Sequence, residues 1–308
     1  MDQHTLETNL ADLPLGQVRF YDSVGSTNDI ASDWADEGAP DLSLVVANRQ
    51  TTGRGRAGRK WFTQPGASLA FSLILQPPIP NCGDISNMRS FTSSAPRPPI
   101  LGESAFPPKG GGQGGVNGYP GIVSRLSGLG ALGVSRGLRK HYSLPTQIKW
   151  PNDVLVKGRK LAGVLAETHW KGNQLSAAIL GIGINIATLS VPPDDVLVFP
   201  ATSVETVLGR SVDRLSLLRS VISEVLFWRS LLAAPEFILA WEADLAFLSE
   251  QVQIVSAGKQ GEVTHLVHEG YIAGLDSDGS LKLHLLSGEE AIVRLGEIRL
   301  RLVDSSPK

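Results

Sequence analysis

The chain has 308 residues, of which 42% are hydrophobic and 19% charged, and its formal net charge is −2. The length suggests two domains or one large domain with an appendage, and the composition is ordinary for a soluble globular protein. The small net charge argues against a general attraction to nucleic acid. The sequence contains no run of 18 apolar residues, so we expect no membrane span. Cys82 is the only cysteine, so no intrachain disulfide can form, and we expect a reducing, cytoplasmic environment.

The chain up to residue 75 alternates short apolar runs with polar turns. Ser26 and Asp29 form a capping-box pattern, which opens a predicted helix ending at Gly38. About 17 residues precede the first strand, too few for a helix-turn-helix domain, and they lack the pattern of a signal peptide. Strands are predicted at 18–21, 42–47 and 68–75.

Residues 77–121 break this pattern, with nine prolines and nine glycines in 45 positions. Such a composition indicates a low-complexity surface loop, mostly disordered, inserted between a strand and a helix. Residues 122–142 then carry leucines near helical spacing, interrupted by four glycines that weaken the helix. We predict a helix there, with the glycines allowing close packing against the sheet.

The second half of the chain predicts a meander, two helices and a small barrel. Three strands joined by glycine-containing turns are expected between 148 and 186, and helical patterning follows over 213–248 with a break at Pro235. Five short strands follow from Gln251 in about 55 residues, which is typical of a small β-barrel. The predicted fold class is α+β: a mixed central sheet with helices in a catalytic domain, 1–248, plus a C-terminal SH3-like β-barrel, 249–308.

The stretch 53–61, GRGRAGRKW, places three glycines and four cations in nine positions. Glycines let a loop fold closely over a ligand, and guanidinium groups bind phosphate and carboxylate oxygens in pairs. The stretch also fits G-x-G-x-x-G, but no helix pattern follows it, and no acid stands about 20 residues on, so a dinucleotide fingerprint is not supported. A solvated basic turn is the alternative for this stretch taken alone.

Further polar positions stand at predicted turns and strand ends, and each has a structural alternative. Ser26, Thr27 and Asn28 either cap a helix or bind a small polar head group at its N-terminus. Lys160 begins a strand, where a lysine is usually solvated, and 150–153 form a polar corner that could satisfy backbone groups or face a metal–nucleotide site. Glycines inside the apolar run GIGIN, 181–185, indicate close approach by a ligand or another backbone.

Four signals in order, GSTND, RQTTGRGRAGRKW, KWPNDVLVKGRKLAGVLAE and GIGINI, make the chain resemble the biotin–protein ligases. This family attaches biotin to the biotin carboxyl carrier protein. The resemblance covers 18–75 and 122–303, about three quarters of the chain, and includes the short C-terminal barrel. It implies a monofunctional enzyme without a DNA-binding domain. Such an enzyme makes biotinyl-5′-AMP from biotin and ATP and then passes biotin to a lysine of its acceptor.

The resemblance also implies a role for each matched position. Lys160, Arg54 and Arg56 are implied to be catalytic, with Asp153 a weak candidate for Mg²⁺ carried by ATP and no tightly bound metal. Trp61 is implied to pack at the adenine side. The implied biotin-binding residues are Ser26, Thr27, Asn28, Gln50, Arg54, Gly55, Arg56 and Lys160. The implied ATP-binding residues are Gly53, Trp61, Asn152 and Asn185.

The implied partner is the biotin carboxyl carrier protein of acetyl-CoA carboxylase or of a related carboxylase, with neither DNA nor a membrane, in a monomer or a homodimer. Two alternatives remain. One is a lipoate or octanoate ligase of the same fold, and the other is a non-catalytic relative that only binds biotin. The 77–121 segment and the glycine-rich helix after it depart from the family pattern.

Overall fold

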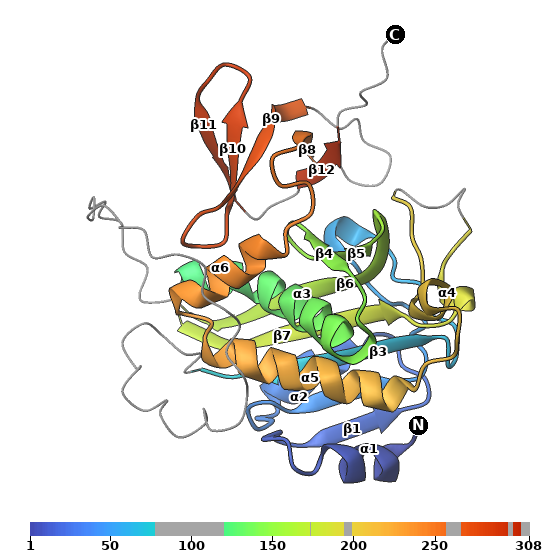
Figure 1. Cartoon of the computed structure of the whole chain (residues 1–308). Helices are drawn as coiled ribbons and strands as arrows, with labels where there is room; N and C mark the ends of the chain where they lie inside the picture. The colour runs from blue at the N-terminus through green and yellow to red at the C-terminus, as the bar shows by residue number, and fades with distance from the viewer. Residues whose placement is uncertain (78–119, 173, 194–198, 257–265, 295–297, 303–308) are drawn as a thin grey trace.

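The computed structural model describes residues 1–77, 120–172, 174–193, 199–256, 266–294 and 298–302 (Figure 1). The predicted insertion, 77–121, falls almost wholly outside these ranges, and so does Cys82. None of the described helices combines the length and the apolarity that a membrane crossing requires.

A seven-stranded mixed sheet forms the centre of the larger part of the chain (Figure 1). Its strands are β1 (Val18–Tyr21), β2 (Leu44–Ala47), β3 (Ser68–Leu75), β4 (Thr146–Lys149), β5 (Asp153–Val156), β6 (Arg159–Lys171) and β7 (Gln174–Asn185). They lie in the order β1-β2-β3-β7-β6-β5-β4, with β1 parallel to β2 and all other neighbours antiparallel. The predicted mixed sheet and its meander are confirmed, whereas β4 was not predicted.

Helices cover both faces of this sheet. The helices are α1 (Gln3–Leu10), α2 (Thr27–Asp36), α3 (Pro120–Tyr142), α4 (Val204–Leu208), α5 (Arg214–Ser230) and α6 (Pro235–Ala243). The helices α3 and α5 pack together with the larger hydrophobic core on one face (Figure 1). On the opposite face, α2 buries Ala31 and Trp34 against Val45, Ile74 and Ile179. The N-terminus of α2 therefore meets the sheet on the face that α3 and α5 leave uncovered.

The glycines of α3 face other elements closely: Gly130 packs against the sheet, as predicted, and the other three pack against helices. A Cβ on Gly130 would lie 2.7 Å from Val164 of β6, and one on Gly137 would lie 3.0 Å from Val221 of α5. Gly128 and Gly133 are equally close to α6 and α5. The helix gives up intrinsic propensity at these positions and gains a tight fit against the sheet and two helices.

The helix α1 was not predicted, because the first 17 residues were treated only as a segment ahead of the first strand. Asp2 caps α1 by accepting a hydrogen bond from the Thr5 amide at 2.8 Å. Leu6 and Leu10, four residues apart, are fully or almost fully buried. An N-cap followed by an i, i+4 leucine pair was the available signal.

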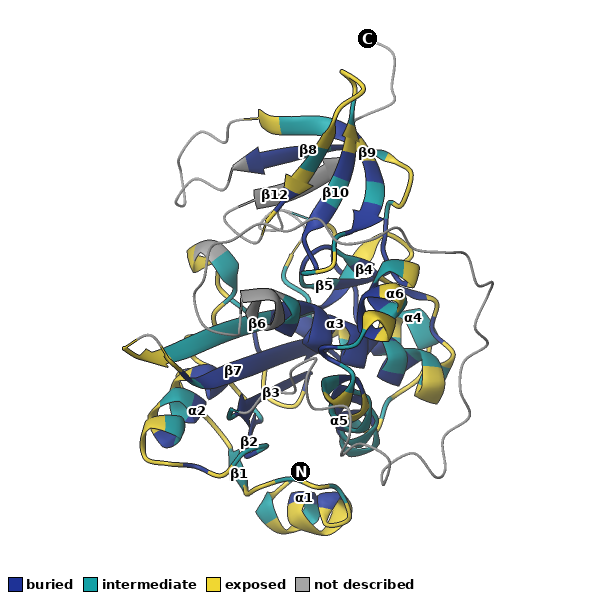
Figure 2. Cartoon of the chain, turned by 90° about the vertical axis from the view of Figure 1, so that its left-hand side faces the viewer, coloured by how far each residue is buried: buried dark blue, intermediate teal, exposed yellow. Residues whose placement is uncertain are grey.

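The C-terminal part forms a second sheet (Figure 2). Its strands are β8 (Gln251–Ser256), β9 (Leu266–Leu275), β10 (Leu281–Leu285), β11 (Glu290–Val293) and β12 (Ile298–Leu302). The five strands are as predicted and lie in the order β11-β10-β9-β8-β12, but over the described residues β11 does not pair with β12 to close a barrel. The β9–β10 turn reaches the larger part, where the buried Trp150 Nε1 donates to the Gly279 carbonyl at 3.0 Å.

Candidate functional site

A cavity of about 500 Å³ lies where the N-terminus of α2, the loop 53–61 and strands β5, β6 and β7 meet. The structure thus brings together residues that lie as much as 175 positions apart in the sequence, from Ser26 to Ala201. All of the predicted site residues except Gly53 line the cavity: Ser26, Thr27, Asn28, Gln50, Arg54, Gly55, Arg56, Trp61, Asn152, Asp153, Lys160 and Asn185.

Gly53 lies at the base of the loop, outside the cavity lining. It is buried, and its carbonyl accepts a hydrogen bond from the Trp61 amide at 2.8 Å. A second bond, from the Gly55 amide to the Arg59 carbonyl at 2.7 Å, closes the tip around a short 3₁₀ turn, Arg56–Gly58. The loop is therefore a narrow hairpin that forms one wall of the cavity.

Glycines on the two long strands form the floor. A Cβ on Gly181 would overlap the Asn28 amide, and one on Gly183 would overlap the Trp61 ring. Gly163 on β6 is also close to Trp61, with 3.2 Å between its ideal Cβ and the ring. The close approach predicted at 181–185 is confirmed, but the approaching groups are side chains of this protein, where the sequence suggested a ligand or a backbone.

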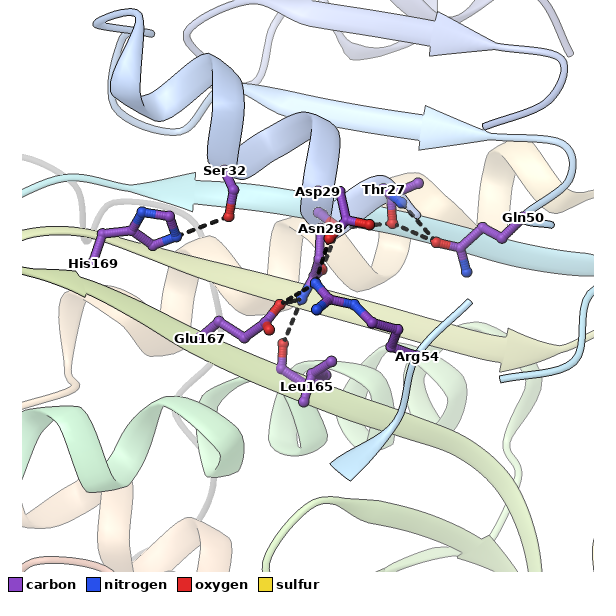
Figure 3. A network of polar contacts seen from close by, with 10 residues as sticks. Thr27, Asn28, Asp29, Ser32, Gln50, Arg54, Leu165, Glu167 and His169 are labelled. Atoms are coloured by element: carbon purple, nitrogen blue, oxygen red, sulfur yellow. Dashed lines mark hydrogen bonds and ion pairs between the residues drawn. The ribbon is translucent and has the colours of Figure 1, made fainter. Parts of the chain in front are cut away.

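One end of the cavity is a neutral hydrogen-bonding network (Figure 3). Gln50 Oε1 accepts from the Thr27 amide at 2.7 Å and from the Thr27 hydroxyl at 3.0 Å. Ser72 Oγ, in the middle of β3, lies 2.8 Å from Thr27 Oγ1 and 2.6 Å from Asn28 Oδ1. Ser26, Thr27 and Asn28 are each only 3% exposed, so these groups form a buried, preorganised pocket.

Asn28 has its amide hydrogens committed to the protein. Its Nδ2 donates to Glu167 Oε2 at 2.6 Å and to the Leu165 carbonyl at 3.3 Å. By contrast, Gln50 Nε2 and Ser26 Oγ have no hydrogen-bond partner among the described residues, and both residues line the cavity. The donors that remain for a ligand at this end are therefore those of Gln50 and Ser26.

The other end of the cavity carries charge. Lys160 Nζ lies 2.6 Å from Asp153 Oδ1, and it stands 5.7 Å from the centroid of the Trp61 ring. The Lys160 main chain is fixed as well, because its amide donates to Pro200 and its carbonyl accepts from Thr202. Burial by itself would raise the pKa of the Asp153 carboxyl, but Lys160, Lys149, a hydrogen bond from Lys160 and Arg59 together hold that pKa below its usual value.

Arg56 and Asn152 complete the charged end. Arg56 Nη1 lies 3.4 Å from Asn152 Oδ1, while Asn152 Nδ2 donates to the Val164 carbonyl at 2.8 Å. Burial lowers the pKa of the Arg56 guanidinium, against the opposing effect of Asp153. Because burial removes part of the water around this guanidinium group, the group interacts strongly with an incoming anion.

Arg54 points elsewhere, although sequence reasoning gave it the same role as Arg56. Its Nη2 lies 2.5 Å from Asp29 Oδ1 and 3.2 Å from Glu167 Oε2 (Figure 3). Asn185 is likewise occupied, because its Nδ2 donates to the Thr202 carbonyl at 3.1 Å. Both side chains line the cavity, and both hold parts of its wall in place.

Sequence reasoning missed three polar residues of the site. Ser72 and Glu167 are polar positions within strands, and each reaches the Asn28 amide. Asp29 was noted only as part of a helix cap, and it pairs with Arg54. A polar residue inside an otherwise apolar strand was the available signal.

The described residues contain no cluster of three or more His, Cys, Asp or Glu side chains that could hold a metal ion. Asp153 is the only acidic residue of the described cavity lining, and Lys160 already pairs with it. The described cavity lining therefore offers a metal ion one carboxylate, whereas a resident metal centre usually takes several oxygen ligands from the protein.

The chain is similar in sequence to known biotin ligases. The chain is 31% identical over 209 residues to the bifunctional ligase/repressor BirA of Bacillus spizizenii, a match that spans 68% of this chain and 52% of that protein. It is 29% identical to the biotin–[acetyl-CoA-carboxylase] ligase of Paracoccus denitrificans, over 82% of this chain and 90% of that one. The chain therefore spans about half the length of the Bacillus relative and most of the Paracoccus relative.

A solved structure agrees with the sequence matches. The biotin protein ligase of Aquifex aeolicus in complex with biotin and ATP superposes with a TM-score of 0.66 at 25% identity, over 93% of this chain and 99% of that one. Residues 20–92 and 117–185 match the model of the biotin/lipoate A/B protein ligase family, and these ranges include the loop 53–61, Lys160 and the glycine floor. The chain therefore contains a domain of the biotin/lipoate A/B protein ligase family.

Proposed function

We propose that this chain activates biotin with ATP to biotinyl-5′-AMP and then transfers biotin to a lysine of a biotin carboxyl carrier protein. The observation that carries the proposal is a single cavity that joins a neutral hydrogen-bonding end to a cationic end. Biotin has this polarity, because its ureido head is neutral and polar and its tail ends in a carboxylate. The relatives from Paracoccus denitrificans and Aquifex aeolicus support the same assignment by their names.

In this proposal the head group occupies the end formed by Thr27, Asn28 and Gln50. Gln50 Nε2 and Ser26 Oγ donate to the ureido oxygen, since the other polar groups there already bond to one another. The glycine floor lets Asn28 and Trp61 pack directly against β7, and these two side chains border the space proposed for the ring system. A buried pocket built to hydrogen-bond a polar head discriminates strongly against an apolar chain, because its polar groups would be left unpaired.

The carboxylate then lies at the end formed by Lys160 and Arg56, next to the α-phosphate of ATP. A carboxylate oxygen attacks the α-phosphorus, the bond to the bridging oxygen breaks, and pyrophosphate leaves with its electron pair. Lys160 and Arg56 stabilise the negative charge on the phosphoryl oxygens as it develops. Trp61, Asn152 and Asn185 are proposed to bound the nucleotide side, with Gly53 and Gly55 shaping the loop over it.

Transfer follows from the same arrangement. The neutral amine of the acceptor lysine attacks the acyl carbon of the mixed anhydride, and AMP leaves with the electrons of the broken acyl–oxygen bond. The proton released from the amine goes to solvent or phosphate. The hairpin over the cavity keeps water from the anhydride, which would otherwise hydrolyse.

Magnesium is proposed to arrive with ATP and to neutralise phosphate charge. A single carboxylate, Asp153, fits an ion that keeps most of its ligands as phosphate oxygens and waters. The proposal uses Asp153 chiefly to orient Lys160, as the 2.6 Å contact supports.

The test is incubation of the protein with biotin, MgATP and an isolated carrier domain, read by intact mass spectrometry. One biotinyl group should be added to the carrier, and none should be added without ATP or to a carrier whose acceptor lysine is replaced by arginine. Lipoate and octanoate serve as competing substrates in the same assay. Transfer of either in preference to biotin, or biotin binding without pyrophosphate release, would replace this proposal with one of the two alternatives.

A further inference from the structure

One carboxylate oxygen connects the pocket for the head group to the loop above it. Glu167 Oε2 accepts from Asn28 Nδ2 at 2.6 Å and lies 3.2 Å from Arg54 Nη2 (Figure 3). The same Arg54 nitrogen lies 2.5 Å from Asp29 Oδ1, in the first turn of α2. Three elements therefore meet at this cluster: the N-terminus of α2, the middle of β6 and the loop 53–61.

Arg54 and Arg56 of the loop therefore face different partners. Arg56 is half-buried beside Asn152, whereas the guanidinium group of Arg54 contacts Asp29 and Glu167. These two carboxylates compete with any ligand anion for Arg54. The geometry fits an arginine that ties the loop down, while Arg56 remains with the charged end of the cavity.

We propose that Glu167, together with Asp29, is a positioning residue for biotin recognition. Glu167 fixes the Asn28 amide in the pocket and, through Arg54, holds the loop 53–61 over that pocket. The assignment rests on the proposed function for its substrate, but the tie between loop, helix and strand is a property of the folded chain alone. Glu167 acts through Asn28 and Arg54 and does not take part in the chemistry.

The expected size of the effect follows from exposure. The side chains of Arg54, Asp29 and Glu167 are 45%, 51% and 31% exposed. Ion pairs this exposed to water change an equilibrium by at most about fivefold each. Removing both carboxylate charges should therefore shift the loop toward its open form by about 5- to 20-fold, without unfolding the protein.

Limited digestion with trypsin tests the tie without any ligand. The loop contains Arg54, Arg56, Arg59 and Lys60, so an open loop is a trypsin substrate and a held loop is protected. In Asp29→Asn/Glu167→Gln, cleavage within the loop should be about 5- to 20-fold faster than in the wild type. Asp33→Asn is the matched control for Asp29→Asn: it makes the same charge change on an exposed position of α2, and the Asp33 carboxylate makes no hydrogen bond or ion pair with the described residues.

Steady-state kinetics supply the second reading. The KM for biotin should rise about 5- to 20-fold in the double variant, with kcat and the KM for ATP within about twofold of the wild type. A purely structural defect would lower the active fraction, and hence kcat, at unchanged KM. Digestion by trypsin does not require catalytic activity. If the wild-type loop is protected but the protein does not transfer biotin, the proposed function is wrong, whereas the contact of Arg54 with Asp29 and Glu167 still holds the loop.

Each single variant has a defined meaning. Asp29→Asn loosens Arg54 without touching Asn28, so it should speed loop cleavage even if Glu167→Gln also disturbs the pocket. The proposal is overturned if Asp29→Asn and the double variant are cut in the loop no faster than Asp33→Asn. It is also overturned if the biotin KM stays at the wild-type value while the loop opens.

Discussion

The two ends of the cavity are built by opposite means. The head-group end consists of neutral side chains that hydrogen-bond one another, with Thr27, Gln50, Asn28 and Ser72 in one chain of contacts. The charged end depends on a close ion pair, Lys160–Asp153, with further cations nearby. The groups that line the first end are neutral dipoles, with the carboxylate of Glu167 behind the Asn28 amide, whereas charged groups themselves line the second end.

The contrast indicates where selectivity and rate should reside. Preorganised neutral donors and acceptors discriminate between head groups, because a mismatched ligand leaves buried polar groups unpaired. Concentrated positive charge adds little discrimination but stabilises the charge that forms at phosphorus. Substitutions at the first end should therefore act on the KM for biotin, and those at the second end should act on kcat.

The largest effect is expected for Lys160→Ala. Loss of the ammonium group should slow adenylate formation by about 10²- to 10³-fold, as is typical when one stabilising group is removed from a transition state, with the biotin KM nearly unchanged. Single-turnover formation of biotinyl-5′-AMP measures this step. Lys157→Gln, an exposed lysine in the turn just before β6, is the control and should retain full rate. A biotin KM that rises as much as kcat falls would remove the distinction between the two ends.

Two glycines on β7 allow the two ends of the cavity to be compared directly, because each glycine lies beneath a side chain of a different end. In Gly181→Ala the new methyl group collides with the Asn28 amide, and in Gly183→Ala it collides with the Trp61 ring. Overpacking of this kind costs about 1–3 kcal/mol, or about 5- to 150-fold in an equilibrium. Gly181→Ala should raise the biotin KM by that factor, whereas Gly183→Ala should act chiefly on the ATP KM or kcat. Isothermal titration with biotin alone separates the two, and equal losses of biotin affinity would contradict the comparison.

Local patterns in the sequence predicted the fold class, and the family resemblance predicted most of the polar residues that line the cavity. The strands around Lys160 and the loop 53–61 are visible in apolar runs and glycines. Which side chains pair could not be read in this way. Asn28 and Glu167 are 139 positions apart, and only the folded sheet shows that the Asn28 amide is already occupied.

The same limit applies to charge. The sequence analysis gave Asp153 and Lys160 separate roles, Asp153 in binding Mg²⁺ and Lys160 in binding biotin and in catalysis. Sequence distance alone does not show that the two side chains pair across the β5–β6 turn. In the structure Lys160 reaches back to Asp153 near an irregularity in that hairpin. Sequence reasoning gave Arg54 and Arg56 the same role for a similar reason. Two arginines that lie two residues apart in a loop do not reveal which side chains each will contact in the folded protein.

An acid titration should expose the charged end. The pKa of Asp153 is lowered on folding, so the ion pair stabilises the protein above the ordinary carboxyl pKa of about 3.9 and is lost as the pH falls through the lower folded value. Asp153→Asn should reduce the free energy of unfolding by about 1–3 kcal/mol, less than the 3–5 typical of fully buried pairs. In urea titrations followed by circular dichroism, the gap to the wild type should be constant from pH 5 to 8 and should narrow below about pH 4. A gap that widens in acid would reverse the sign assigned to this carboxyl.

The smallest expected effect tests whether the C-terminal sheet supports one end only. Trp150 precedes the corner at Asn152 and Asp153, and its Nε1 bonds the Gly279 carbonyl in the β9–β10 turn. Trp150→Phe keeps an aromatic ring but removes this bond, so stability should fall by about 1–2 kcal/mol. If the bond also steadies the corner, the ATP KM should rise about two- to fivefold while the biotin KM stays unchanged. Trp170→Phe, the same change at a side chain that is 46% exposed, should alter neither constant. If Trp150→Phe changed the KM for ATP and the KM for biotin equally, the C-terminal sheet would stabilise the whole cavity. The two ends would then depend on the same packing contact even though their chemistry differs.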